Sequence, residues 1–279
     1  MTGPGGLTVA AALANAKAMG VARLDAQLLL AHALRCDRTW VLAHDDALLS
    51  PSAAAAFTAH AGRRAAGEPL AYLVGEKEFH GLTLTVNAHV LVPRPETEGL
   101  VDWALELLNG ELAHAAPARV LDLGTGSGAI ALAVKHAHPS AQVAALDASA
   151  EALAVAAANA GRLGLHVEFH HSHWWEAVAR RHFHLLLSNP PYIRPGDPHL
   201  AALQHEPQLA LTAGSGGLAA LQAIVAGAAG HLEGGGWLLL EHGHDQAEDV
   251  HALLRRHGLR DAQTRVDLAG LPRCTGARR

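Results

Sequence analysis

The chain has 279 residues, of which 50% are hydrophobic and 4% aromatic, and its formal net charge is -5 with histidine neutral. This length suits one large domain plus a small one, and the lack of a basic excess disfavours a duplex-binding protein. The two cysteines, Cys36 and Cys274, are far apart and predict neither a disulfide framework nor a cysteine zinc site. Because no signal peptide or membrane span is recognisable, the sequence predicts a soluble, cytoplasmic protein.

The N-terminal quarter of the chain has a helical pattern that no strand-like run interrupts. Leu24, Leu28 and Ala31 recur at the spacing of one helix face. Ser50-Pro51 has the residue types of an N-cap followed by proline at the first helical position. The pattern predicts a small helical domain over residues 1–70.

The pattern changes at Glu68-Pro69. Polar and apolar residues then alternate around Gly81, which is typical of a β-hairpin. We therefore expect residues 71–92 to form a β-hairpin linker. A proline-rich segment, residues 93–98, follows it and leads into the next domain.

Strand-like and helix-like segments alternate through the rest of the chain. The expected strands are residues 120–123, 141–146, 167–170, 183–188 and 237–241, with edge strands near the C-terminus, and the expected helices include 96–108, 129–136 and 149–163. The uncharged residues 209–230 fit a loop and a core helix. Such alternation predicts an α/β domain over residues 93–279, with a mainly parallel sheet covered by helices on both faces.

A glycine-rich loop follows the first of these strands and opens a helix; it contains Gly124, Thr125, Gly126, Ser127 and Gly128. Asp147 ends the next strand, about 20 residues on, where a carboxylate can accept hydrogen bonds from ribose hydroxyls. The pair predicts a nucleotide-containing ligand. It also fits the relaxed dinucleotide fingerprint, and a tight turn without any ligand is the structural alternative.

The strand at residues 183–188 decides between these ligands, because it ends in Asn189, Pro190, Pro191 and Tyr192. Ligands bind at the carboxyl ends of parallel strands, so this tetrapeptide should face the ligand of the glycine loop. A nicotinamide enzyme has no evident use for it, whereas an enzyme that methylates an amide or amino nitrogen does. A proline-rich turn that caps a buried strand is the alternative.

The chemistry of methyl transfer to an amide explains these residue types. The nitrogen is a poor nucleophile because its lone pair is delocalised, and it becomes positive as it gains a methyl group. Asn189 Oδ1 and the Pro190 carbonyl can accept its two N–H groups, while consecutive prolines hold these acceptors in place. The ring of Tyr192 can cover the planar amide and exclude water.

On these motifs the sequence resembles the protein-(glutamine-N5) methyltransferases of peptide chain release factors, the HemK/PrmC family. The resemblance covers nearly the whole chain and is strongest between Glu68 and Glu241. Its most specific segment is Pro-Arg-Pro-Glu-Thr-Glu at residues 93–98, since adenine-N6 DNA methyltransferases share the Asn-Pro-Pro-Tyr motif. The other segments that carry it are residues 68–73, 78–82, 122–129, 189–192, 197–200 and 239–243.

The resemblance implies a Rossmann-like class I SAM-dependent methyltransferase domain with a seven-stranded sheet, preceded by a helical substrate-docking domain. It implies that S-adenosyl-L-methionine binds residues 124–128, Asp147 and Trp174, next to Asn189. It also implies that residues 189–192 hold the glutamine of the Gly-Gly-Gln tip of a class 1 release factor. Arg94 would shape the entrance of that pocket, or else only cap a helix or pair with Glu96.

Two segments depart from the family pattern. His173 stands where related proteins often carry an acidic residue that accepts from the adenine amino group, so its contact with adenine is open. Residues 270–274 are less charged than expected, which should affect an edge strand only. Glu241 either faces the cleft or caps its strand, and Trp175 is expected to be a packing residue.

The remaining candidates are weaker. No cysteine or carboxylate cluster accompanies His170, His171, His173, His242 and His244, so no metal site is expected. Two other functions stay open: an adenine-N6 DNA or RNA amino-methyltransferase, which would need a basic channel, and a non-catalytic SAM-binding protein. Neither stable nucleic-acid binding nor membrane binding is expected.

Overall fold

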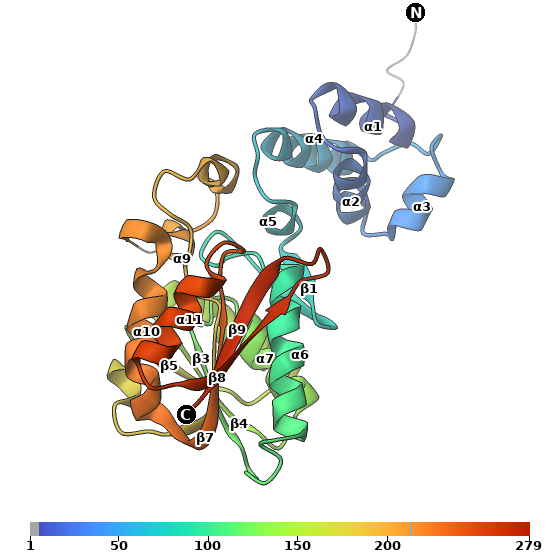
Figure 1. The fold of residues 1–279 in the computed structure, drawn as a ribbon. Coiled ribbons are helices and arrows are strands. Elements are labelled where there is room, and N and C mark those ends of the chain that lie inside the picture. The colour runs from blue at the N-terminus through green and yellow to red at the C-terminus, as the bar shows by residue number, and fades with distance from the viewer. Residues whose placement is uncertain (1–5, 213) are drawn as a thin grey trace, which may run out of the picture. The chain divides into compact units, whose positions relative to one another are not determined.

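A computed structural model describes residues 6–212 and 214–279 and divides the chain into two compact units, Met1–Glu76 and Lys77–Arg279 (Figure 1). Within these residues, no helix is long and apolar enough to cross a membrane. Each unit has its own hydrophobic core, and each is described here separately.

The first unit is helical. Its core contains Leu29, Leu30 and Phe57, all at most 2% exposed. Ser50 caps its longest helix, because its hydroxyl accepts a hydrogen bond from the backbone N–H of Ala53 at 3.2 Å. The helices are α1 (Val9–Ala18), α2 (Arg23–Leu34), α3 (Arg38–Ala43), α4 (Pro51–Ala65) and α5 (Leu70–Val74).

The buried face of α2 coincides only in part with the face shared by Leu24, Leu28 and Ala31. Leu24 is 51% exposed, whereas Ala26, Leu29 and Leu30 are buried. The leucines of this helix are compatible with two adjacent faces, and packing against α1 and α4 selects one of them. Of the three residues predicted to share one helix face, Ala31 is therefore buried, whereas Leu24 is exposed.

The second unit begins with a hairpin of β1 (Glu76–Phe79) and β2 (Leu82–Thr85), which turns at Gly81 with φ of 78°. Its main sheet has seven strands in the order β5-β4-β3-β6-β7-β9-β8. The strands β3 to β7 are mutually parallel and β9 is antiparallel to both neighbours. Their bounds are β3 (Arg119–Leu123), β4 (Gln142–Asp147), β5 (Glu168–His171), β6 (Phe183–Ser188), β7 (Leu232–Glu241), β8 (Arg260–Val266) and β9 (Pro272–Arg278).

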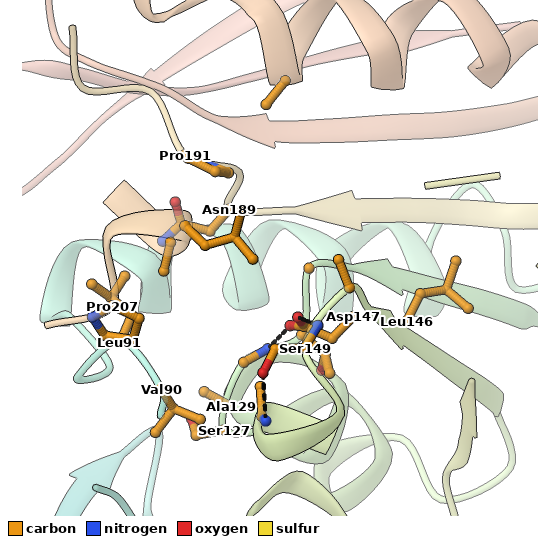
Figure 2. A pocket seen from close by; sticks show the side chains of 18 of the residues that line it. Val90, Leu91, Ser127, Ala129, Leu146, Asp147, Ser149, Asn189, Pro191 and Pro207 are labelled. Atoms are coloured by element: carbon orange, nitrogen blue, oxygen red, sulfur yellow. Dashed lines mark hydrogen bonds between the residues drawn. The ribbon is translucent and has the colours of Figure 1, made fainter. Parts of the chain in front are cut away.

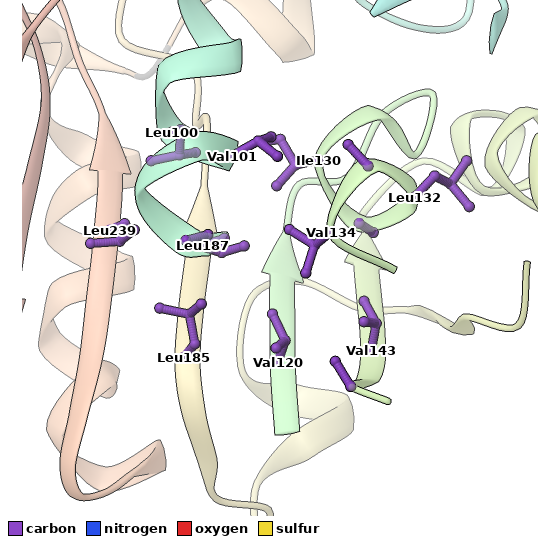
Figure 3. Packing of buried hydrophobic residues seen from close by; sticks show 14 of the residues in the cluster. Leu100, Val101, Val120, Ile130, Leu132, Val134, Val143, Leu185, Leu187 and Leu239 are labelled. Atoms are coloured by element: carbon purple, nitrogen blue, oxygen red, sulfur yellow. The ribbon is translucent and has the colours of Figure 1, made fainter. Parts of the chain in front are cut away.

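Helices cover both faces of this sheet, as the alternating pattern predicts. One face packs against α6 (Pro95–Asn109), α7 (Ala129–Ala137) and α8 (Ala150–Leu163), and Figure 3 shows side chains of this core. The other face packs against α10 (Ala219–His231) and α11 (Ala247–Arg256). Short helical segments complete the chain: η1 (Glu176–Val178), η2 (Pro198–Leu203), α9 (Gln208–Leu211) and η3 (Ser215–Gly217).

Alternation along β6 explains the two cores. Leu185 and Leu187 point to the α6 and α7 side, while Leu186 belongs to the cluster on the α10 side. Successive side chains of a strand point to opposite faces, so a fully apolar strand marks a sheet buried on both faces. This is why the run at residues 183–188 identified a buried strand correctly.

The C-terminal strands differ in part from the expectation. β8 is an edge strand, but β9 lies between β7 and β8, and Cys274 on β9 is paired with Glu241 on β7. The expectation that residues 270–274 affect only an edge strand was therefore wrong. The reason is topological: β8 and β9 form an antiparallel hairpin that adds to β7 through its second strand.

Candidate active site

The carboxyl ends of β3, β4 and β6 border a cavity of about 510 Å³. Its volume lies within the range of small-molecule sites. Figure 2 shows side chains around it, with Asn189 and Pro191 on one side and Asp147 and Ser149 on another. Of the residues predicted from the sequence, the cavity wall contains Arg94, Gly124, Thr125, Gly126, Ser127, Asp147, Trp174, Asn189 and Pro191. Gly128, Pro190 and Tyr192 lie outside this wall.

The glycine loop owes its shape to backbone conformations that side chains rarely adopt. Gly124, Gly126 and Gly128 have φ of 76°, 55° and 85°. Gly128 is also packed closely, because a Cβ there would lie 2.9 Å from Leu132 Cδ1. Gly126 has open space around the same position. The third glycine is thus needed for packing, while the second is needed only for its conformation.

Asp122 anchors this loop to the strand before it. The Thr125 hydroxyl donates a hydrogen bond of 2.6 Å to Asp122 Oδ2, and Asp122 is fully buried. Burial raises the pKa of Asp122 to about 7, although the hydrogen bond from Thr125 works in the opposite direction. This role of Asp122 could not be predicted from the sequence, since a lone aspartate inside an apolar strand belongs to no specific motif.

Asp147 joins the ends of β4 and the glycine loop. Its Oδ2 accepts from the backbone N–H of Gly126 at 2.8 Å, and its Oδ1 accepts from that of Ser149 at 2.9 Å. Burial raises its pKa, and these hydrogen bonds to the charged form oppose that rise. Each carboxylate oxygen can accept a second hydrogen bond, so the group can still receive a ligand hydroxyl at the cavity wall.

Asn159 on α8 links the loop to the hairpin. Its Oδ1 accepts from the Thr85 N–H at 2.7 Å, and its Nδ2 donates to the carbonyl oxygens of Thr85 and Ser127, each at 3.0 Å. Asn159 is 0% exposed, so a buried amide satisfies backbone groups of two segments. Nothing local distinguishes this asparagine in the sequence, because its partners are 32 and 74 residues away.

The two adjacent tryptophans occupy different environments. Trp174 lines the cavity with a positive φ of 52°, and His173 beside it also lines the cavity. The two rings meet edge to face with centroids 5.8 Å apart. Trp175 instead donates from Nε1 to the Ala223 carbonyl at 3.0 Å and stacks on His231 at 4.4 Å, so it is a packing residue as expected.

The loop after β6 turns one amide toward the cavity. Asn189 Nδ2 donates to Thr97 Oγ1 at 3.1 Å, and Asn189 lines the cavity. The consequence is that Oδ1, on the other side of the planar amide, points away from Thr97. Pro190, the next residue, is buried. The Tyr192 hydroxyl donates to Glu241 Oε1 at 3.2 Å, so its polar end is held inside the protein.

Arg94 is paired with Glu206, a residue that no sequence motif indicated. Its guanidinium donates to Glu206 Oε1 at 2.5 Å, and Glu206 Oε2 accepts from the backbone N–H of Val92 at 3.1 Å. Glu206 has a side chain only 3% exposed, and Arg94 remains one-third accessible. The structure therefore pairs Arg94 with Glu206 and not with Glu96, and holds the segment before α6 against the η2–α9 region.

Glu241, at the end of β7, lies behind the cavity wall and is 1% exposed. Burial raises its pKa to about 7, while the hydroxyls of Thr97 and Tyr192 and the charge of Arg273 lower it. Glu241 therefore does not line the cavity, and it contacts Tyr192, in the loop after β6, from inside the protein. Within the described residues, no group of three or more His, Cys, Asp or Glu is placed to hold a metal ion.

Comparisons with known proteins find matches in both units of the chain. Residues 7–75 match the model of the PrmC N-terminal domain, and residues 97–206 match that of the methyltransferase small domain. The release factor glutamine methyltransferase of Bordetella pertussis is 51% identical over 92% of this chain and 95% of its own length. That of Xylella fastidiosa is 48% identical over 96% of this chain and 97% of its own length.

Solved structures show the same fold at low sequence identity. The hMettl16 catalytic domain has a TM-score of 0.57 at 15% identity, over 78% of this chain and 81% of that one. A 16S rRNA methyltransferase of T. Thermophilus, solved with AdoMet and guanosine, has a TM-score of 0.55 at 21% identity, over 73% and 49%. The second unit has the fold of SAM-dependent methyltransferases, and with relatives of this identity and coverage the chain belongs to the release factor glutamine methyltransferase family.

Proposed function

We propose that this chain transfers a methyl group from S-adenosyl-L-methionine to the side-chain amide nitrogen (N5) of the glutamine in the Gly-Gly-Gln motif of class 1 release factors. The observation that carries the proposal is one cavity whose wall contains both Asp147 of the glycine-loop side and Asn189 of the β6 loop. The names of the relatives, and their identity over nearly the full chain, support the substrate.

The residues around the cavity fit this cofactor. Asp147 offers a carboxylate for ribose hydroxyls, and the Trp174 ring offers a flat surface beside Gly124, whose added Cβ would lie 3.9 Å from that ring. The positive φ angles of the loop glycines bring backbone close to the cavity without side chains in the way. When bound, S-adenosyl-L-methionine supplies a methyl group activated by a sulfonium centre.

The chain's own residues then align the substrate amide. Asn189 Oδ1 accepts one N–H of the glutamine amide, because Nδ2 is already engaged with Thr97. Pro190 itself does not line the cavity, but its carbonyl, between Asn189 and Pro191 of the cavity wall, is proposed to accept the other, and Pro191 stiffens the loop. Two fixed acceptors stabilise the positive charge that develops on the nitrogen, and a cavity wall rich in apolar side chains excludes water. As the N–C bond forms, the methyl group leaves the sulfonium sulfur, and the positively charged nitrogen releases one of its two protons to solvent. Positioning is the main contribution, since a nitrogen made acidic in this way needs no strong base.

Substrate access is part of the proposal. Arg94, one-third exposed at the cavity wall and held by Glu206, is proposed to contact the release factor backbone around the glutamine. The cytoplasmic location and the lack of stable nucleic-acid binding predicted from the sequence belong to the same proposal. The net charge of -5 supports a protein substrate over a polyanion.

A methyl-transfer assay tests the proposal against its alternatives. Purified protein is incubated with radiolabelled cofactor and one of three acceptors: a class 1 release factor, the same factor with the tip glutamine changed to alanine, or DNA. We expect label on the first acceptor alone. Label on DNA but not on the release factor would support the amino-methyltransferase, and cofactor binding without label on any acceptor would support the non-catalytic protein.

A further inference from the structure

Asn189 must present its oxygen and not its nitrogen to the substrate, yet the two ends of an amide have nearly the same shape. A rotation of 180° about the last side-chain bond exchanges them. With Oδ1 toward the substrate, the loop accepts an N–H of the glutamine. With Nδ2 there, two donors face each other and the substrate is rejected. The site therefore needs a device that selects one orientation.

Thr97, in the first turn of α6, contacts the amide directly. Asn189 Nδ2 donates to its hydroxyl oxygen at 3.1 Å, and Thr97 is only 4% exposed. A hydroxyl has one proton and two lone pairs, so it can either accept from Nδ2 or donate to Oδ1. Thr97 by itself is thus compatible with both orientations of Asn189.

Glu241 can determine where the hydroxyl proton of Thr97 points. It is 1% exposed and accepts from the Tyr192 hydroxyl at 3.2 Å. Glu241 Oε2 is buried without a hydrogen-bond partner, and the Thr97 hydroxyl is near enough to the carboxyl group to lower its pKa. An ionised carboxylate has no proton to donate. It attracts the hydroxyl proton of Thr97 and leaves the lone pairs of that oxygen for Asn189.

We propose that Thr97 and Glu241 are positioning residues: ionised Glu241 directs the Thr97 hydroxyl, which keeps the Asn189 amide turned with Oδ1 toward the substrate. The inference rests on the proposed function, because the required orientation follows from an amide substrate. It extends the site beyond the loop of residues 189–192 to Thr97 of α6, which also lines the cavity, and to Glu241 of β7, which does not.

The surroundings of Glu241 make the device dependent on pH. Burial raises its pKa to about 7, Thr97, Tyr192 and Arg273 favour the charged form, and Glu96 opposes it. Cys274, its partner on β9, is buried and has a raised pKa, so it adds no charge near neutral pH. As pH falls through about 7, Glu241 gains a proton and no longer directs Thr97. The turnover of the wild-type protein should fall with it.

The test uses Thr97→Val, Thr97→Ser and Glu241→Gln in the full chain, with a release factor as substrate. Valine keeps the shape of threonine without the hydroxyl, and serine keeps the hydroxyl. We expect Thr97→Val and Glu241→Gln to lower kcat by about 10-fold or more, with the cofactor Kd within about 2-fold of wild type. Thr97→Ser should retain kcat within about 3-fold, and Glu241→Gln should lose the inflection near pH 7.

Wild-type kcat in Thr97→Val, or an equal loss in Thr97→Ser, would overturn the inference, and this pair remains informative if Glu241→Gln does not fold. A spectroscopic measurement tests the positioning role of Thr97 and Glu241 independently of the proposed function. The Nδ2 protons of Asn189 should show nuclear Overhauser contacts to Thr97 in the wild type, and these should weaken in Glu241→Gln. If wild type methylates no release factor, the proposed function fails, while unchanged contacts in Glu241→Gln would reject the positioning device itself.

Discussion

The two loops that meet at the cavity are held by different means. The loop of residues 124–128 is fixed by its own glycine conformations and by Asp122 and Asp147, which lie within about one βα unit of it. The loop of residues 189–192 is fixed by Thr97 and Glu241, which are 92 and 49 residues away from their partners. One loop is a local motif, and the other depends on side chains brought together only by the fold.

The difference matters for how each loop can fail. A local loop fails through its backbone, because a side chain at a glycine adds strain where it stands. A loop held by distant partners keeps its backbone when one partner is lost, but its side chains lose their orientation. The following predictions separate these two kinds of failure.

The largest effect is expected for Gly128→Ala. It places a Cβ 2.9 Å from Leu132 Cδ1 and 3.2 Å from Ala156 Cβ at a φ of 85°, so we expect the free energy of unfolding to fall by about 3 kcal/mol. Gly126→Ala is the matched control: its φ is also positive but its surroundings are open, and it should cost about 1 kcal/mol. Equal denaturant midpoints for the two variants would contradict the packing role of Gly128.

Asn189→Ala should separate turnover from cofactor binding. We expect kcat to fall about 100-fold, since the amide acceptor is lost, while the cofactor Kd measured by calorimetry changes by less than about 3-fold. Asp147→Asn is its counterpart on the local loop and should show the opposite split, with Kd weakened about 10-fold and kcat at saturation nearly kept. A Kd loss in Asn189→Ala as large as its kcat loss would show that the two loops are not separable.

Asp122→Asn should change how stability depends on pH. The pKa of Asp122 rises from 3.8 in the unfolded chain to about 7 in the folded one, so its contribution to stability is present at low pH and is lost as pH rises through about 7. Asparagine does not ionise, so the stability of the variant does not decrease in this way as pH rises. The variant should gain on the order of 2 kcal/mol relative to wild type between about pH 5 and about pH 8. Parallel stability profiles for the two proteins would count against this.

The smallest effect is expected for His173→Asp. The imidazole lies at the cavity wall beside Trp174, and a carboxylate at this position would be a better acceptor for an adenine amino group. We expect the cofactor Kd to decrease by about 3-fold with no change in kcat. An unchanged Kd would place the adenine out of reach of residue 173.

The sequence predicted the local loop better than the distant one. The glycine loop could be recognised because β3, the glycines and Asp147 follow one another within a short segment of the chain. The apolar run at residues 183–188 also predicted β6 with its observed bounds. Glu206 and Asn159 could not be found in the same way, since their partners lie 32 to 114 residues away. The interior position of β9 was not predicted for a related reason. The residue pattern of one strand does not determine which strands it pairs with in the sheet.

By itself, the sequence determined the order of strands and helices, the glycine loop and the presence of Asn189-Pro190-Pro191-Tyr192 at the end of a buried strand. These follow from periodicity, backbone freedom and the side-chain chemistry of neighbouring residues. Only the tertiary structure decided which way that tetrapeptide is held. Asn189 is held by Thr97 of α6, and Tyr192 is held by Glu241, a buried carboxyl group at the end of β7, because burial makes hydrogen bonds between distant residues strong enough to orient a side chain.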